Sequence, residues 1–206
     1  MYGIDVVSKR LSLLDKEVIK FALDWKGTKC VVEFGAGSGR LSLILALLGY
    51  RVFIYDRIKP FFIERLKDLD LRVGLKLKDI GEIKPSELPE IIGIFVAERV
   101  LHFLRFSDTK RVLKIVLNRM EKGGRLFISF SGLNSPLGKG YAHKDLPVEE
   151  RFCLPSKGVM EKFKIDVPVC LYTLEDVEKL FDELSIRKVF LRETPFGNVE
   201  GIFERI

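Results

Sequence analysis

Residues 30–49 read CVVEFGAGSGRLSLILALLG, and this stretch decides the class of fold. Its first five residues form a short, largely apolar run that predicts a strand, and its last ten are apolar nearly all round, which predicts a buried helix closed by Gly49. Between the two runs, three glycines stand on alternate positions, where a chain poor in side chains lets its backbone approach another group closely. A strand, a tight turn and a helix in this order form the first unit of an α/β fold.

The same alternation of strands and helices continues along the chain. Helices are predicted at 12–27, 60–70, 107–124 and 174–184, and strands at 50–56, 71–79, 91–98, 125–131, 186–194 and 199–206. The last two strands flank a turn at 195–198 and read as an antiparallel hairpin. We therefore predict an α/β, doubly wound, mostly parallel seven-stranded sheet with helices on both faces and a C-terminal antiparallel hairpin.

The pattern of apolar and polar residues in each strand also predicts the position of that strand within the sheet. The runs at 30–34 and 91–98 are nearly continuous and belong in the middle, whereas 71–79 alternates apolar and polar residues as an edge strand does. Residues 132–172 show no clear period and are interpreted as an insertion or lid. We expect one domain over 1–206, with an N-terminal helical segment at 1–29.

Composition narrows the functional classes. Hydrophobic residues make up 47% of the 206, and no apolar window approaches the length of a membrane span. The N-terminal residues lack the order of a signal peptide, so a cytoplasmic protein is expected. The net charge of +6 is spread over 35 basic and 29 acidic residues, which is weak evidence for nucleic acid. The absence of glutamine and the abundance of Lys, Glu and Arg are a thermophilic composition.

The spacing of the glycines separates three classes of ligand. A phosphate-binding loop needs GxxxxGK followed by Ser or Thr, and no lysine follows Gly39 at that spacing. A dinucleotide site needs GxGxxG, whereas Gly35, Gly37 and Gly39 lie at GxGxG and Arg40 takes the sixth position. The three cysteines lack the spacing of a zinc site, and no metal site is predicted.

The spacing that fits is ExGxGxG, from Glu33 to Gly39, and here the sequence resembles the class I S-adenosylmethionine-dependent methyltransferases, which have a Rossmann-like fold. The resemblance covers about residues 30–131. The helix and hairpin after it look like the small-molecule methyltransferases of the ubiquinone-biosynthesis and tellurite-resistance type. The resemblance implies a transferase that uses S-adenosyl-L-methionine as its cofactor.

The resemblance also implies a cofactor site. Gly35 and Gly37 pass under the methionine part, Glu33 holds its amino group directly or through water, Asp56 accepts the ribose hydroxyls, and Asp79 contacts the adenine. Taken alone, Asp56 fits a turn or helix cap equally well, and Asp79 fits a solvated loop. The implied cofactor-binding residues are Glu33, Phe34, Gly35, Ala36, Gly37, Gly39, Asp56, Arg57, Asp79, Ile80, Ala97 and Glu98.

The acceptor side carries fewer signals. His102 follows the strand at 91–98 and is the candidate catalytic residue, because histidine titrates near working pH; a His packed beside Phe103 is the alternative. Tyr141, His143 and Tyr172 are candidate substrate-binding residues, or else the insertion's own core.

The class of acceptor stays open. Amino-methylating nucleic-acid enzymes carry Asn or Asp, two prolines and an aromatic after the fourth strand, where this chain has Val96-Ala97-Glu98-Arg99. A small molecule is the leading hypothesis. An RNA methyltransferase is the alternative, since the pI is about 9.2, and a protein acceptor or a non-catalytic cofactor-binding module in a complex also stays open. Oligomeric state is not predicted.

Overall fold

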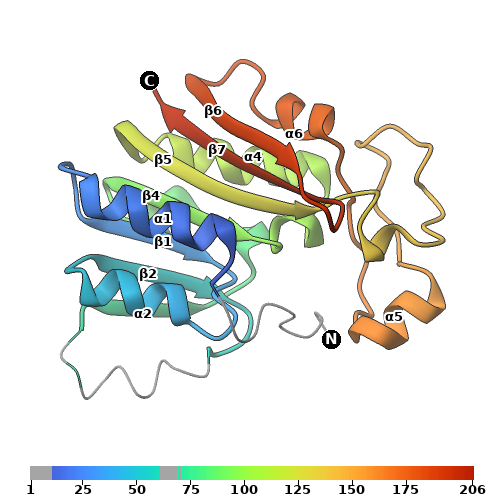
Figure 1. Ribbon diagram of the computed structural model, residues 1–206, viewed down its shortest axis with the longest axis horizontal. Coiled ribbons are helices and arrows are strands. Elements are labelled where there is room, and N and C mark those ends of the chain that lie inside the picture. The colour runs from blue at the N-terminus through green and yellow to red at the C-terminus, as the bar shows by residue number, and fades with distance from the viewer. Residues whose placement is uncertain (1–10, 61–68, 70) are drawn as a thin grey trace.

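A computed structural model describes residues 11–60, 69 and 71–206 and contains a seven-stranded sheet in the order β3-β2-β1-β4-β5-β7-β6 (Figure 1). Strands β1 to β5 pair in parallel, and β7 runs antiparallel to both β5 and β6. The predicted doubly wound sheet with a C-terminal antiparallel hairpin is confirmed. The strands are β1 Cys30–Phe34, β2 Arg51–Asp56, β3 Val73–Leu77, β4 Ile92–Glu98, β5 Met120–Ser131, β6 Ile186–Glu193 and β7 Asn198–Arg205.

The burial of each strand explains its place in the sheet. All five residues of β1 are buried, as are the first six of β4, and both strands have neighbours on either side. Strand β3 has no buried residue and forms one edge, as its alternating sequence predicted.

Helices cover both faces of the sheet (Figure 1). The apolar stripes of α1 and α2 pack on one face, and those of α4 and α6 pack on the other. Ser12 and Asp15 form a capping box at the start of α1, and Thr173 and Asp176 form one at the start of α6. The helices are α1 Leu13–Asp24, α2 Arg40–Leu47, α4 Phe106–Leu117, α5 Lys157–Phe163 and α6 Leu174–Leu180. The predicted helix at 60–70 lies largely outside the described residues.

The boundary between α4 and β5 differs from the prediction. The helix begins after an N-cap at Arg105 and ends at Leu117, not at the glycines 123 and 124. Strand β5 starts at Met120, and its pairing with β4 shifts between Met120 and Arg125. Gly123 takes a positive φ of 79°, and a Cβ on Gly124 would lie 2.8 Å from the Gly93 carbonyl oxygen. The two glycines therefore form an irregularity within the strand instead of a helix stop.

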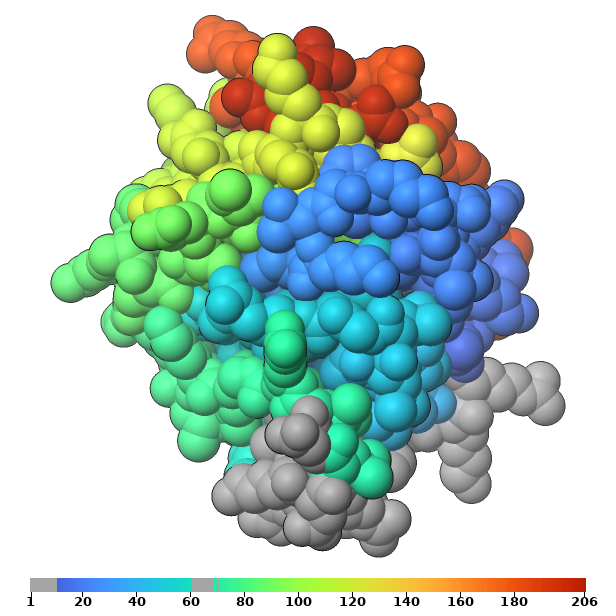
Figure 2. All heavy atoms as spheres, turned by 90° about the vertical axis from the view of Figure 1, so that its left-hand side faces the viewer, coloured from blue at the N-terminus to red at the C-terminus, as the bar shows by residue number. Residues whose placement is uncertain are grey.

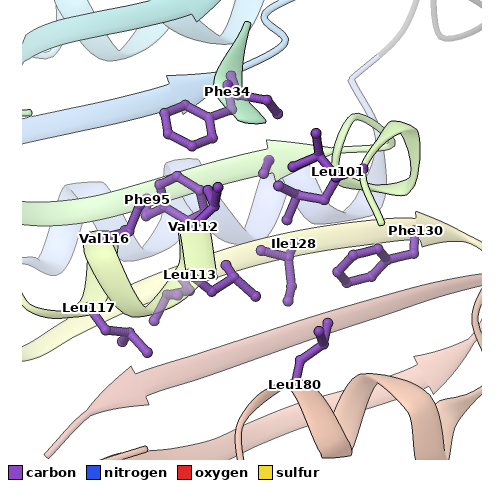
Figure 3. Close-up of a cluster of buried hydrophobic side chains, with 14 of the residues drawn as sticks. Phe34, Phe95, Leu101, Val112, Leu113, Val116, Leu117, Ile128, Phe130 and Leu180 are labelled. Atoms are coloured by element: carbon purple, nitrogen blue, oxygen red, sulfur yellow. The ribbon is translucent and has the colours of Figure 1, made fainter. Parts of the chain in front are cut away.

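The hydrophobic clusters on the two faces of the sheet differ in size. The larger cluster lies between the sheet and α4 and α6, and its aromatic and aliphatic side chains interlock in Figure 3. Phe34 at the end of β1 packs edge-on against Phe95 of β4, with ring centroids 5.0 Å apart. This packing fixes the carboxyl ends of β1 and β4 side by side.

Residues 132–172 hold more regular structure than their sequence predicted. They include α5 and the 3-10 turn Pro136–Gly138. A small cluster of their own contains Leu137, Tyr141, Val159, Ile165, Val169 and Leu171. A buried ion pair between Arg151 and Asp176, 2.5 Å apart, joins this segment to α6. The segment lies beyond the arrowheads of β4 and β5 in Figure 1.

The opposite side of the molecule is the end at which the parallel strands begin. Figure 2 shows it from the end where the parallel strands begin, with cyan below, blue and green in the middle and yellow and red above, which follows the strand order. None of the helices in the described part of the chain has the length and apolar character needed to cross a membrane.

Candidate functional site

A cavity of about 1120 Å³ opens along the carboxyl edge of the sheet. Because the strand order is β3-β2-β1-β4-β5-β7-β6, the loops after β1, β2 and β3 line one half and the ends of β5, β6 and β7 line the other. The loop after β4 lies between them. Ligands of open α/β sheets bind at this edge, where the strand order reverses.

The glycine turn brings bare backbone to the first half. Gly35, Gly37 and Gly39 all have positive φ, at 67°, 55° and 80°, and Gly35 and Gly37 line the cavity. A Cβ on Gly35 would lie 2.7 Å from the Cβ of Val100, so no larger residue fits without movement. Gly39 is the N-cap of α2 and does not line the cavity.

The other residues of the turn lie behind it. Phe34 is fully buried against Tyr55 and Phe95, and Ala36 packs against the cluster under α1 and α2. Neither side chain lines the cavity.

Glu33 also lies behind the cavity wall instead of in it. Its side chain is buried, and its carboxylate accepts a hydrogen bond from Ser42 Oγ in α2. Burial raises the pKa of Glu33 to about 7, while the Ser42 hydroxyl lowers it. Glu33 does not line the cavity, and its contact with the cofactor amino group, which the resemblance implied directly or through water, stays a prediction.

The ends of β2 and β3 place two acids and an apolar residue at the cavity. Asp56 lines it and accepts the backbone N–H of Ile58 at 2.9 Å; burial raises the pKa of Asp56, and surrounding backbone N–H groups oppose the rise. Asp79 lines it too, pairs with Arg57, and accepts the backbone N–H of Gly81 at 2.8 Å. Ile80 is buried beside it and lines the same wall.

The end of β4 supplies a third acid. Ala97 is fully buried within the strand and does not line the cavity, whereas Glu98 does. Ser12 Oγ, at the start of α1, donates to Glu98 Oε2 at 3.2 Å. Burial, together with the nearby Asp15 carboxylate, raises the pKa of Glu98 to about 9. The Glu98 carboxyl is therefore largely protonated at neutral pH.

His102 lines the cavity from the 3-10 turn Leu101–Phe103 after β4. Its side chain is 3% exposed and packs against Phe103 with ring centroids 4.3 Å apart. The Nδ1 atom is buried without a hydrogen-bond partner in the described part of the chain. Burial, together with the positive charge of Arg99, lowers the pKa of His102 to about 3. The imidazole is therefore neutral across the physiological range.

The three candidate substrate-binding residues lie outside the cavity lining. Tyr141 is buried and its hydroxyl donates to the Val169 carbonyl oxygen at 2.5 Å. Tyr172 is buried against Phe130, with ring centroids 4.3 Å apart. His143 lies beside the Glu150 carbonyl, 3.2 Å away. Tyr141 and Tyr172 thus contribute to the packing of residues 132–172 and to the contact of this segment with the sheet.

Residues that the sequence did not indicate line the second half of the cavity. They come from the start of α1, the loop after β4, the segment 132–172 and the terminal hairpin, and no local motif marks them. They include Ser12, Arg99, Ser129, Ser131, Ser135, Leu137, Phe163, Ile165, Arg192, Thr194, Phe196, Asn198 and Glu200.

Sequence comparison gives short matches only. No family model matches the chain. Over 62 residues it is 42% identical to a protein-L-isoaspartate O-methyltransferase of Chlorobium luteolum, covering 29% of this chain and 28% of that one. Over 71 residues it is 39% identical to protein-L-isoaspartate O-methyltransferase 2 of Geotalea uraniireducens, covering 32% and 33%. The chain thus spans about a third of the length of these curated relatives.

Structural comparison covers nearly the whole chain. An S-adenosylmethionine-dependent methyltransferase of Clostridium acetobutylicum superposes with a TM-score of 0.69, at 11% identity, over 97% of this chain and 94% of that one. TehB of Haemophilus influenzae superposes with a TM-score of 0.65, at 17% identity, over 98% of this chain and 64% of that one. The 1,6-didemethyltoxoflavin-N1-methyltransferase of Burkholderia thailandensis superposes with a TM-score of 0.67, at 14% identity, over 98% of this chain and 81% of that one. Its structure was solved with 1,6-didemethyltoxoflavin and S-adenosylhomocysteine bound. The chain therefore has the class I fold of the S-adenosylmethionine-dependent methyltransferases.

Proposed function

We propose that the protein is an S-adenosylmethionine-dependent methyltransferase that acts on a small molecule. One observation carries the proposal: the glycine turn after β1, Asp56 at the end of β2 and Ile80 after β3 line one continuous half of a single cavity. The short matches to methyltransferases and the fold agree with it.

The residues of this half fit the three parts of the cofactor. The exposed backbone of Gly35 and Gly37 suits the amino-acid end, the Asp56 carboxylate suits two ribose hydroxyls, and the apolar side chain of Ile80 suits the adenine ring. Asp79 is already held by Arg57 and Gly81 N–H, so its carboxylate has fewer positions left for the adenine amino group. Glu33 does not line this half of the cavity, so the fit to the cofactor does not depend on its side chain.

When bound, S-adenosylmethionine supplies a methyl group on a sulfonium, whose charge makes it a good leaving group. The protein's own contribution is then to position two reactants and exclude water. We propose that the His102 imidazole contacts the acceptor from the 3-10 turn after β4. Since burial keeps His102 neutral, it suits hydrogen bonding to an acceptor better than taking up a full charge.

The size of the cavity supports a small acceptor. Sites for small ligands hold roughly 300–1,000 Å³, so about 1120 Å³ suits a cofactor together with a compact second ligand. The toxoflavin-type enzyme with this fold acts on a small molecule by its name. The protein named in the sequence matches methylates isoaspartate in a protein, but those matches span too little of either chain to carry over its acceptor.

Calorimetric titration with S-adenosylmethionine tests the proposal. Wild type should bind, and the double variant Asp56→Ala with Gly37→Arg should lose binding at least about a hundredfold, since it removes charged hydrogen bonds and fills the turn. Asp182→Ala, at an exposed aspartate outside the cavity lining, is the matched control and should bind as wild type does. Absent binding by wild type, or equal binding by the double variant, would refute the proposal.

A further inference from the structure

The cavity lining contains an arginine, Arg99, that has no ion-pair partner among the residues that the structure describes. Arg99 follows β4 directly and lines the cavity between its two halves. In the residues that the structure describes, no carboxylate forms an ion pair with its guanidinium. The other arginines of the lining differ in this respect, because Arg57 pairs with Asp79, and Arg192 pairs with Glu200 at 2.9 Å.

The neighbouring acid does not neutralise Arg99. Glu98 is adjacent in sequence, but its carboxyl is held by Ser12 and, with its pKa raised to about 9, carries little charge at neutral pH. The charge of Arg99 reaches His102 instead, where it lowers the pKa of the imidazole. Arg99 and His102 therefore act on the same part of the cavity.

The backbone at Arg99 is strained in a way that fixes this position. Its φ is 48°, a left-handed conformation that costs a residue with a side chain roughly 1–2 kcal/mol. Two hydrogen bonds hold it there, from the Arg99 N–H to the Ser129 carbonyl oxygen at 2.9 Å and to Ser129 Oγ at 3.1 Å. Strain of this kind concentrates at sites of function.

The cavity that Arg99 lines carries both polar and apolar side chains. Phe103 and Leu137 line the cavity near the loop after β4, Phe163 and Ile165 line it from the end of α5 onward, and Phe196 lines it from the terminal hairpin. Leu137 and Ile165 are buried, whereas Phe196 is 75% exposed. A guanidinium without an ion-pair partner, in a cavity that also offers apolar side chains, suits a planar or tetrahedral oxyanion on an apolar body.

We propose that the acceptor is a small organic anion, with an apolar body and a carboxylate or phosphate that the Arg99 guanidinium binds. The methyl-accepting atom then lies toward His102 and the apolar body lies against Phe163 and Phe196. This inference rests on the proposed function, since it names the substrate class of the same cavity.

Equilibrium dialysis against a defined mixture tests the proposal. The mixture contains several hundred small metabolites, with carboxylates, phosphates, neutral compounds and amines in equal number, and one short single-stranded RNA. The protein is wild type, Arg99→Asn or Lys164→Asn, each loaded with S-adenosylhomocysteine, and the bound compounds are identified by mass spectrometry. Asparagine tolerates the left-handed backbone, so Arg99→Asn removes the charge without adding strain. Lys164, with a φ of 53°, is exposed and outside the cavity lining, and is the matched control.

Wild type and Lys164→Asn should enrich one or a few small anions, and Arg99→Asn should enrich them about tenfold less or worse, as expected for the loss of a charge-assisted hydrogen bond. Enrichment of neutral compounds, amines or RNA alone, no enriched anion, or equal enrichment by Arg99→Asn would overturn the proposal. Titration of the same three proteins with S-adenosylmethionine separates the two claims. A wild type that binds no cofactor refutes the proposed function, whereas intact cofactor binding with a failed dialysis refutes only the anionic acceptor.

Discussion

Replacing Gly35 by alanine tests whether the glycine turn is built for close backbone approach. The φ of 67° at Gly35 would cost an alanine about 1–2 kcal/mol. The new Cβ would also lie 2.7 Å from Val100 Cβ and Cγ2, and overpacking of this kind costs about 1–3 kcal/mol. The two terms sum to about 2–5 kcal/mol, or a fall of about 5–15 °C in the melting temperature of a chain this long.

Two further variants separate strain from steric overlap. Gly49→Ala has a φ of 85° but meets nothing within 4 Å, so it should cost only the strain of about 1–2 kcal/mol. Gly35→Ala combined with Val100→Gly removes the overlapping atoms, so the pair should show a favourable coupling of about 1 kcal/mol or more in a double-mutant cycle. Urea denaturation measures the free energies of unfolding of five proteins: wild type, Gly49→Ala and the three variants of the cycle, Gly35→Ala, Val100→Gly and the double variant. Equal costs for Gly35→Ala and Gly49→Ala, with no coupling to Val100, would refute the reasoning.

Two predictions concern the titrating groups of the cavity. Glu98 has a folded pKa of about 9, above its ordinary value, so its contribution to stability is present below about pH 4.5 and is lost as pH rises toward 9. The free energy of unfolding of wild type changes by about 1.4 kcal/mol per pH unit at most, and about half of that is expected because Glu98 contacts cavity solvent. Between pH 5 and pH 8, the stability of Glu98→Gln relative to wild type should therefore rise by about 2 kcal/mol. A difference in free energy of unfolding that stays constant with pH in urea denaturation would contradict this. His102, with a pKa near 3, should show constant imidazole NMR shifts from pH 5 to 8, and a midpoint within that range would contradict its neutral state.

The first half of the cavity could be predicted from sequence because its residues follow strand ends. Gly35 directly follows β1, Asp56 is the last residue of β2 and Asp79 stands two residues after the end of β3, and parallel strands bring such positions to one edge. Glu33 shows the limit of that logic. The motif places an acid before the turn, but the side chain faces Ser42 of α2, and only the packing of that helix decides it.

The second half depends on contacts between distant segments. Ser12 reaches Glu98 across 86 positions, and Phe163 and Phe196 meet the cavity from α5 and the hairpin. Contacts between segments so far apart in the sequence cannot be predicted from the spacing of residues along the chain. The glycines after α4 failed as a helix stop for a similar reason, since the approach of Gly93 to Gly124 is visible only once β4 and β5 pair.

A crystal structure of the protein with S-adenosylhomocysteine tests the central claim most directly. The account predicts that the adenosine lies between Asp56 and Ile80, with the amino-acid end over Gly35 and Gly37 and the sulfur facing the loop after β4. An open space should remain beside Arg99 and His102 for the acceptor. Density elsewhere in the molecule, or the adenosine in the half lined by Phe163 and Phe196, would contradict the account.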